Sequence, residues 1–192
     1  MNIIICGAGR VGFTIAKLLT EQNHSITVID QSSEDIQKIN DDLEVKSIVG
    51  KATYPSVLEK ANAEDADMII AATHSDEVNM VTCQVAHSIF DIPRKIARLR
   101  SQSYLDAIYA DLYRRDHLPI DVVKSPELEV AEAALKRLSS PNAFESETFL
   151  NNQAQLLGLH IEDNCPVVNT PLRQLTDLFS TLRVIVVGVR RQ

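Results

Sequence analysis

The sequence predicts an α/β fold built on a doubly wound parallel sheet, because short apolar runs alternate with helix-length segments. Six runs rich in β-branched residues have the length of strands, at residues 2–6, 25–29, 45–49, 67–72, 95–99 and 121–124. A glycine-rich turn follows the first run directly. Parallel strands need crossover connections, and the intervening segments are long enough for helices. We therefore expect helices on both faces of one sheet.

The helices of this sheet are expected between the strands. In the first, which follows the glycine turn, apolar residues recur on one face: Val11, Ile15, Leu18 and Leu19. Further helices are expected at about residues 33–41, 55–61, 76–90 and 104–113. A face of this kind buries each helix against the sheet.

A crossover helix and a smaller unit are expected after the last strand. The crossover helix, at about residues 126–138, has an apolar stripe formed by Leu128, Ala131, Leu135 and Leu138. Ser139-Ser140-Pro141-Asn142 should break it, which gives a first domain over 1–140 and a partial α+β subdomain over 141–192. Its apolar runs are 148–150, 155–159 and a final strand at 184–189. About 50 residues are few for an independent core, so we expect a truncated chain or completion by dimerisation.

Composition and charge exclude several classes of function. The net charge of −7 provides no basic patch for a phosphate backbone, so nucleic acid is not an expected partner. The three cysteines are widely spaced, and the five histidines lack zinc-binding spacing. No export signal or membrane-spanning run is apparent, which predicts a cytosolic protein with reduced thiols.

The most informative motif is a GxGxxG turn between the first strand and the first helix: Gly7, Ala8, Gly9, Arg10, Val11 and Gly12. Gly7 permits the tight turn, Gly9 lets a pyrophosphate approach the backbone, and Gly12 lets helix and strand pack closely. The helix N-terminus presents N–H groups to anionic oxygens. Arg10 is equally compatible with a phosphate contact and with a solvated side chain.

Asp30 ends the second strand, about 20 residues after the glycine turn, where a carboxylate accepts both ribose hydroxyls and repels a 2′-phosphate. The alternative is a tight turn in a domain that has lost its ligand. Further candidate walls lie where other strands end, because ligands of open α/β sheets bind at that edge. They are Gly50, Lys51 and Ala52 after the third strand, and Thr73 and His74 after the fourth. Arg98 and Arg100 alternate along the fifth strand and project to one face, either as phosphate clamps or as surface ion-pair partners.

These residues resemble the regulator of potassium conductance (RCK) domain family. The resemblance runs through GAGRVG, the strand end at Asp30, IVGKATYPSVL at residues 48–58, DADMIIAATHSDEVNM at 65–80 and IARLRS at 96–101. It covers roughly residues 1–140. The tail is similar to the beginning of the small C-terminal subdomain of that family.

The resemblance implies a cytosolic regulatory subunit that binds NAD(H) and adenine nucleotides such as ATP and ADP. It also implies a homodimer or higher oligomer that docks on a membrane-embedded, potassium-translocating subunit. By motif, the phosphate loop is residues 7–11, the ribose acid is Asp30, and the further contacts are Thr73, His74 and Arg98. Position 74 is usually Asn in the family. Arg100 would contact a further phosphate when ATP is bound.

The sequence favours a sensor over an enzyme, although two alternatives stay open. A dehydrogenase needs a second surface that holds substrate against the cofactor, and little chain remains to build one. An oxidoreductase fragment whose substrate domain lies beyond Gln192 is one alternative, and an apo structural subunit is the other. Asp76 and Glu77 are better explained by the helix dipole than by paired-carboxylate catalysis or a metal site.

Overall fold

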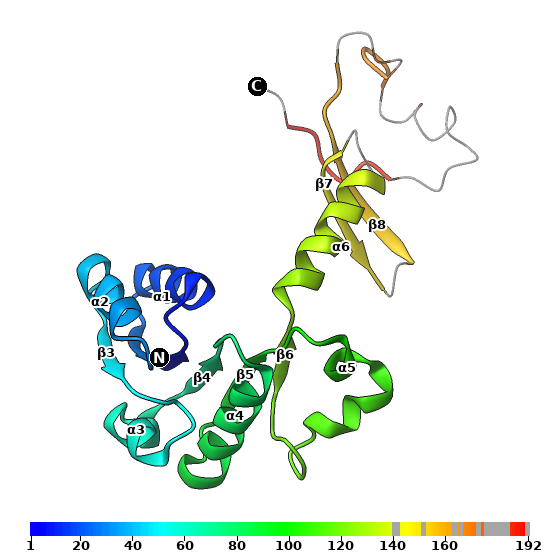
Figure 1. The fold of residues 1–192 in the computed structure, drawn as a ribbon. Helices are drawn as coiled ribbons and strands as arrows, with labels where there is room; N and C mark the ends of the chain where they lie inside the picture. The colour runs from blue at the N-terminus through cyan, green and yellow to red at the C-terminus, as the bar shows by residue number, and fades with distance from the viewer. Residues whose placement is uncertain are drawn as a thin grey trace. The chain divides into compact units, whose positions relative to one another are not determined.

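The computed structural model describes residues 1–139, 143–150, 153–162, 165, 167–171, 174 and 185–190 (Figure 1). The chain divides into two compact units, Met1–Val130 and Ala131–Gln192. The domain boundary expected at residue 140 stays a prediction.

The first unit is built on a six-stranded parallel sheet in the order β3-β2-β1-β4-β5-β6. Its strands are β1 (Asn2–Cys6), β2 (Ser25–Asp30), β3 (Lys46–Val49), β4 (Met68–Ala71), β5 (Arg94–Arg98) and β6 (Val122–Lys124). This order confirms the doubly wound, Rossmann-type sheet. The strand order reverses between β1 and β4, so the expected ligand site lies where these two strands end.

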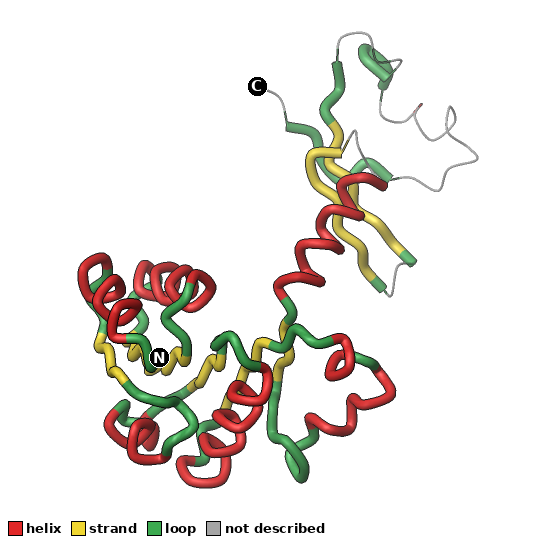
Figure 2. Tube along the Cα trace, in the orientation of Figure 1, coloured by secondary structure: helices red, strands yellow, loops and turns green. Residues whose placement is uncertain are grey.

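Helices cover both faces of this sheet, because successive side chains of a strand point to opposite faces. Ile3 and Ile5 of β1 pack in a buried cluster with residues of α1 (Arg10–Glu21) and α2 (Ser33–Asp42). Ile4 and Cys6 belong to a second cluster, with residues of α3 (Pro55–Lys60) and α4 (Asp76–Phe90). Figure 2 shows these helices around the strands.

The prediction of one continuous α-helix at 104–113 is wrong. The chain instead forms a short helix α5 (Gln102–Leu105) and a 3-10 helix η2 (Ala107–Tyr113). Asp106 separates them in an extended conformation, and its carboxylate accepts the Ile108 N–H at 3.0 Å. An aspartate that binds the backbone locally competes with a continuous helix. A further 3-10 turn, η1 (Ala63–Asp65), precedes β4.

The C-terminal part contains the expected crossover helix and a hairpin. Helix α6 is Pro126–Ser139, and β7 (Ala143–Phe149) pairs antiparallel with β8 (Ala154–Leu159). Leu128, Leu135 and Leu138 of the expected apolar stripe are exposed. The strand expected at 184–189 is wrong for the described residues 185–190, which form no strand. Residue 184 and the predicted break at 140–142 lie outside the described residues.

Candidate functional site

The turn between β1 and α1 depends on Gly7. Its φ is +111°, a conformation that other residues rarely adopt. A Cβ at this position would lie 2.7 Å from the Ala72 carbonyl oxygen, because the turn passes close to the end of β4. The Gly7 N–H donates to the Ile29 carbonyl oxygen at 2.8 Å. The turn is therefore held against both neighbours of β1.

The other two glycines of the motif have different surroundings. A Cβ on Gly12 would lie 1.8 Å from the Gly7 carbonyl oxygen, so any larger residue would force the helix away from the turn. A Cβ on Gly9, by contrast, would meet nothing within 4 Å. Gly9 has extended backbone angles and precedes α1 as its N-cap residue. Its lack of a side chain leaves open space in front of the helix.

The N-terminus of α1 has no counter-charge of its own. Its N-cap residue makes no side-chain hydrogen bond, and its first turn contains no acidic residue. In contrast, Ser32 and Ser75 cap α2 and α4, and acidic residues occupy the first turns of both. The free N–H groups and the positive end of the α1 dipole suit an anion. Arg10, the first residue of α1, is exposed beside this space.

Asp30 lies at the end of β2 and binds the glycine turn. One carboxylate oxygen accepts the Ala8 N–H at 2.6 Å, and the other accepts the Ser32 N–H at 2.8 Å. The side chain remains half-buried, and each oxygen has a second lone pair. Asp30 can therefore hold the turn in place and still accept ribose hydroxyls. The tie to Ala8 was not foreseen from the sequence.

The segment after β3 lies beside Asp30, since the Gly50 N–H donates to the Asp30 carbonyl oxygen at 2.8 Å. Lys51 is exposed, and its ammonium lies 5.6 Å from the centre of the Tyr54 ring. Ala52 is buried in the core. Of the three predicted wall residues, Lys51 thus has the side chain most accessible to a ligand.

Thr73 and His74, which follow β4, have different environments. The Asn79 side chain accepts hydrogen bonds from the Thr73 N–H at 2.9 Å and the Thr73 hydroxyl at 2.7 Å. The Asn79 amide donates to the Arg98 carbonyl oxygen at 2.8 Å. Asn79, which is fully buried, therefore joins the ends of β4 and β5. His74 is exposed at the same edge.

Asp76 also joins these strand ends rather than forming a catalytic pair with Glu77. One Asp76 oxygen accepts the N–H groups of Arg100 and Ser101, both at 2.9 Å. Asp76 is buried, whereas Glu77 is exposed and accepts the Ser75 hydroxyl. The pKa of the Glu77 carboxyl is lowered by a hydrogen bond to its own backbone and by the hydrogen bond from the Ser75 hydroxyl. The two carboxylates have separate structural roles.

Arg98 and Arg100 meet at one carboxylate, which confirms that they project to the same face. An Arg98 terminal nitrogen donates to Glu127 at 2.8 Å, and the Arg100 Nε lies 3.7 Å from the same oxygen. The Arg98 side chain is only 14% exposed, and its buried Nε has no hydrogen-bond partner in the described part of the chain. The pKa of the Glu127 carboxyl is lowered, mainly by a hydrogen bond to its own backbone and then by the positive charges of Arg98 and Arg100.

The sequence reasoning missed Asn79 and Glu127 as parts of this edge. Asn79 is polar, yet it lies on the buried face of α4, together with Met80, Cys83 and Ala86. A polar residue on a buried helical face is a signal that sequence inspection can detect. Glu127 had no comparable signal, because an acid in a first helical turn is common for dipole reasons.

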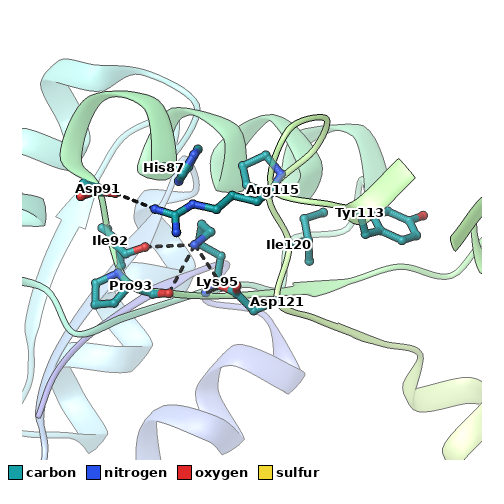
Figure 3. A pocket seen from close by; sticks show the side chains of 10 residues that line it. His87, Asp91, Ile92, Pro93, Lys95, Tyr113, Arg115, Ile120 and Asp121 are labelled. Atoms are coloured by element: carbon teal, nitrogen blue, oxygen red, sulfur yellow. Dashed lines mark hydrogen bonds and ion pairs between the residues drawn. The ribbon is translucent and has the colours of Figure 1, made fainter. Parts of the chain in front are cut away.

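A separate hollow lies at the opposite edge, where β5 and β6 begin (Figure 3). Its volume is about 250 Å³, and buried Lys95 lies at its base. The Lys95 ammonium contacts the Asp121 carboxylate at 3.0 Å and the carbonyl oxygens of Ile92 and Pro93 at 3.1 and 3.4 Å. All three ammonium protons are thus used, so the lysine is a structural ion-pair partner.

Other chemistry is not assembled in the described residues. They contain no group of three or more potential metal ligands, and no helix among them is long and apolar enough to span a membrane. Cys6 and Cys83 are free and buried. Burial raises the pKa of both thiols, that of Cys83 to about 12, which makes them poor nucleophiles.

The sheet order and the glycine turn at its switch point define this chain as a Rossmann-type domain. The chain belongs to the TrkA-N domain family, whose model matches residues 3–126. It is 47% identical over 191 residues to the Trk system potassium uptake protein TrkA of Azorhizobium caulinodans, covering 100% of this chain and 42% of the relative. It is 39% identical over 172 residues to TrkA of Halomonas elongata, covering 90% and 37%. The chain thus spans less than half the length of these relatives.

Solved structures share the fold. The TrkA-N domain of the inner membrane protein ybaL from Escherichia coli superposes with a TM-score of 0.62 at 20% identity, covering 71% of this chain and 96% of that one. The AMP-bound Kef C-terminal domain of Shewanella denitrificans has a TM-score of 0.59 at 25% identity, with coverages of 73% and 80%. The GsuK channel bound to NAD has a TM-score of 0.56 at 22% identity, with coverages of 78% and 25%.

Proposed function

We propose that this chain is the nucleotide-sensing part of a cytoplasmic regulatory subunit of a Trk-type potassium uptake system. The observation that carries the proposal is the open N-terminus of α1, which Gly9 leaves unobstructed and which has no acidic residue in its first turn. The TrkA relatives support the transport system, since they are named for potassium uptake. Residues 1–140 would form the sensing domain, and 141–192 would begin a C-terminal subdomain.

The ligand we propose is NAD(H), with ATP or ADP as alternatives at the same site. Its phosphates would lie at the α1 N-terminus, and Asp30 would accept the ribose hydroxyls. A 2′-phosphate would meet the Asp30 charge, so NADPH should bind weakly. The structural relatives bound to AMP and to NAD support a nucleotide of this class.

The partners we propose are a second copy of the chain, in a homodimer or higher oligomer, and the membrane-embedded, potassium-translocating Trk subunit. A ligand controls transport only if it binds one arrangement of the assembly more tightly than another. No enzymatic step is proposed. Asp76 and Asn79 are occupied by backbone contacts at this edge, and the relatives' names favour transport over oxidoreduction.

Calorimetric titration of the purified chain with NADH, NADPH, ATP and ADP tests this proposal. We expect NADH or an adenine nucleotide to bind, NADPH to bind at least about tenfold more weakly, and nicotinamide absorbance to stay constant. Consumption of NADH with added hydroxy or keto acids would instead indicate an oxidoreductase. If a folded sample binds none of the four at millimolar concentration, the sensor proposal is wrong.

Two substitutions of Asp30 sharpen the test. Asp30→Ala should weaken NADH binding by about 1.5–3 kcal/mol, because a charged acceptor is lost. Asp30→Asn keeps one carbonyl acceptor, which can serve the Ala8 N–H but not the Ser32 N–H as well, and it removes the charge. It should therefore lose less NADH affinity than Asp30→Ala and should gain NADPH affinity. Unchanged NADH affinity in Asp30→Ala, within about twofold, would place the ribose elsewhere.

A further inference from the structure

The hollow where β5 and β6 begin is lined by polar groups that the fold does not fully use, and Asp121 supplies the acceptor. One of its oxygens accepts the Lys95 N–H at 2.7 Å and contacts the Lys95 ammonium at 3.0 Å. Its other oxygen accepts no hydrogen bond from the described residues, and the Asp121 side chain is 45% exposed. The buried lysine therefore fixes this carboxylate and leaves one of its oxygens available in the hollow.

Arg115 supplies a donor in the same hollow. Its guanidinium lies 3.9 Å from an Asp91 oxygen, which is too long for a hydrogen bond, and it makes no hydrogen bond within the described part of the chain. Figure 3 shows the side chain extending from the loop after η2 toward Asp91, with His87 on one side and Lys95 on the other. Because the Arg115 side chain is 83% exposed, its donors are accessible to a ligand.

The charges around the hollow select the class of ligand. The carboxylates of Asp91 and Asp121 oppose an anion, and the cations of Lys95 and Arg115 oppose a cation. A molecule that carries both charges can satisfy both sets of groups. Its carboxylate would pair with the Arg115 guanidinium through two charge-assisted hydrogen bonds, and its ammonium would donate to the available Asp121 oxygen.

The size and walls of the hollow restrict the ligand further. Its volume of about 250 Å³ is below the range of about 300–1,000 Å³ that is usual for pockets of drug-sized ligands, so a nucleotide is too large for it. Apolar residues complete the lining: Ile92, Pro93, Pro119 and Ile120. A small apolar side chain therefore matches the rest of the surface.

We propose that this hollow binds a small zwitterion, an α-amino acid with an apolar side chain. Arg115 holds its carboxylate, and Asp121, positioned by Lys95, holds its ammonium. The hollow lies at the opposite edge of the sheet from the glycine turn, so this second ligand does not compete with a nucleotide.

The test uses L-valine and two compounds that each lack one of its charged groups. 3-Methylbutanoate lacks the ammonium, and isobutylamine lacks the carboxylate. Each is titrated into the full chain labelled with ¹⁵N, and the backbone amide signals are followed by NMR at constant pH and salt. We expect L-valine to shift the signals of residues 87–95 and 113–121, and each partial compound to bind at least about tenfold more weakly.

Arg115→Gln, with Arg114→Gln as the matched control, assigns the binding to the hollow. The Arg114 side chain is also exposed, but it lies near Asp111 and Asp116 and does not line the hollow. Arg115→Gln should weaken L-valine binding at least about tenfold, whereas Arg114→Gln should change it by no more than about twofold. Because both side chains are exposed, both variants should keep the urea midpoint of the unsubstituted chain.

Three results would overturn the inference. They are the absence of shifts at these residues with L-valine at high millimolar concentration, binding of 3-methylbutanoate as tight as that of L-valine, and equal losses in the two arginine variants. NADH titrated into the same sample reports separately on residues 7–12 and on Asp30. Failure of the amino-acid site therefore leaves nucleotide sensing intact, and failure of nucleotide binding leaves the amino-acid site intact.

Discussion

Helices α1 and α4 begin at the same edge of the sheet, after adjacent parallel strands, but their first turns differ. In α4 the Ser75 hydroxyl accepts the Val78 N–H at 3.3 Å, and Asp76 and Glu77 lie at the positive end of the dipole. In α1 the N-cap residue is Gly9, with no side-chain hydrogen bond and no acid in the first turn. A protein normally satisfies its helix ends, so one left open beside a satisfied one marks a place for an external anion.

The same contrast applies to the polar groups around each helix. Around α4, Asn79 and Asp76 use their hydrogen-bonding capacity on the backbone at the ends of β4 and β5, which ties these ends together. Around α1, Asp30 binds the Ala8 and Ser32 N–H groups and remains half-buried. One strand end is therefore devoted to structure, while the other combines structure with an accessible carboxylate.

The largest effect on stability is expected from Gly12→Ala, which disrupts the packing of α1 against the glycine turn. The added Cβ would lie 1.8 Å from the Gly7 carbonyl oxygen, and backbone on both sides must shift. We expect a loss of about 3 kcal/mol or more in the free energy of unfolding, measured by urea denaturation. Full stability in this variant would mean that α1 and the turn are less closely packed than described.

A smaller loss of stability is expected from Asn79→Ala, which removes the hydrogen bonds that α4 makes to the ends of β4 and β5. The substitution leaves the Thr73 N–H and the Arg98 carbonyl oxygen without their side-chain partner in a buried place. The free energy of unfolding should fall by about 2–3 kcal/mol. Asn79→Asp is an informative comparison, because it keeps the acceptor for Thr73 but loses the donor for Arg98. A stability change below about 0.5 kcal/mol in Asn79→Ala would show that this bridge contributes little.

The smallest effect on stability, and a sharp effect on binding, is expected from Gly9→Asp. This change gives α1 the kind of cap that α4 already has, at a position where a Cβ meets nothing within 4 Å. Stability should change by only a few tenths of a kcal/mol. Nucleotide affinity should fall at least about tenfold, because the new carboxylate occupies the anion position.

The matched control for Gly9→Asp is Ser75→Ala, which removes the side-chain cap at the N-terminus of α4. It should cost about 1 kcal/mol of stability and leave nucleotide affinity unchanged. If Gly9→Asp binds nucleotide as well as the unsubstituted chain, the phosphates do not lie at the α1 N-terminus.

Much of the fold and part of the site were predictable from residue patterns alone. The β-branched runs predicted all six strands of the sheet to within one residue at each end, since strands buried by helices require such runs. The end of β2 at Asp30 was also anticipated. The helix at 104–113 was not, because the local hydrogen bond of Asp106 competes with helical periodicity and has no signature of its own.

The division between sequence and tertiary structure follows from the range of the interactions. The sequence by itself determined the glycine turn, the acid at Asp30 and the order of strands and helices. These features depend on residues that are close together in the chain and on the regular spacing of apolar residues. Only the tertiary structure decided that Asp30 holds Ala8, that Asn79 joins β4 to β5, and that Glu127 pairs with Arg98. Those contacts join residues 19 to 29 positions apart, and packing of the elements, rather than any local pattern, brings such residues within hydrogen-bonding distance.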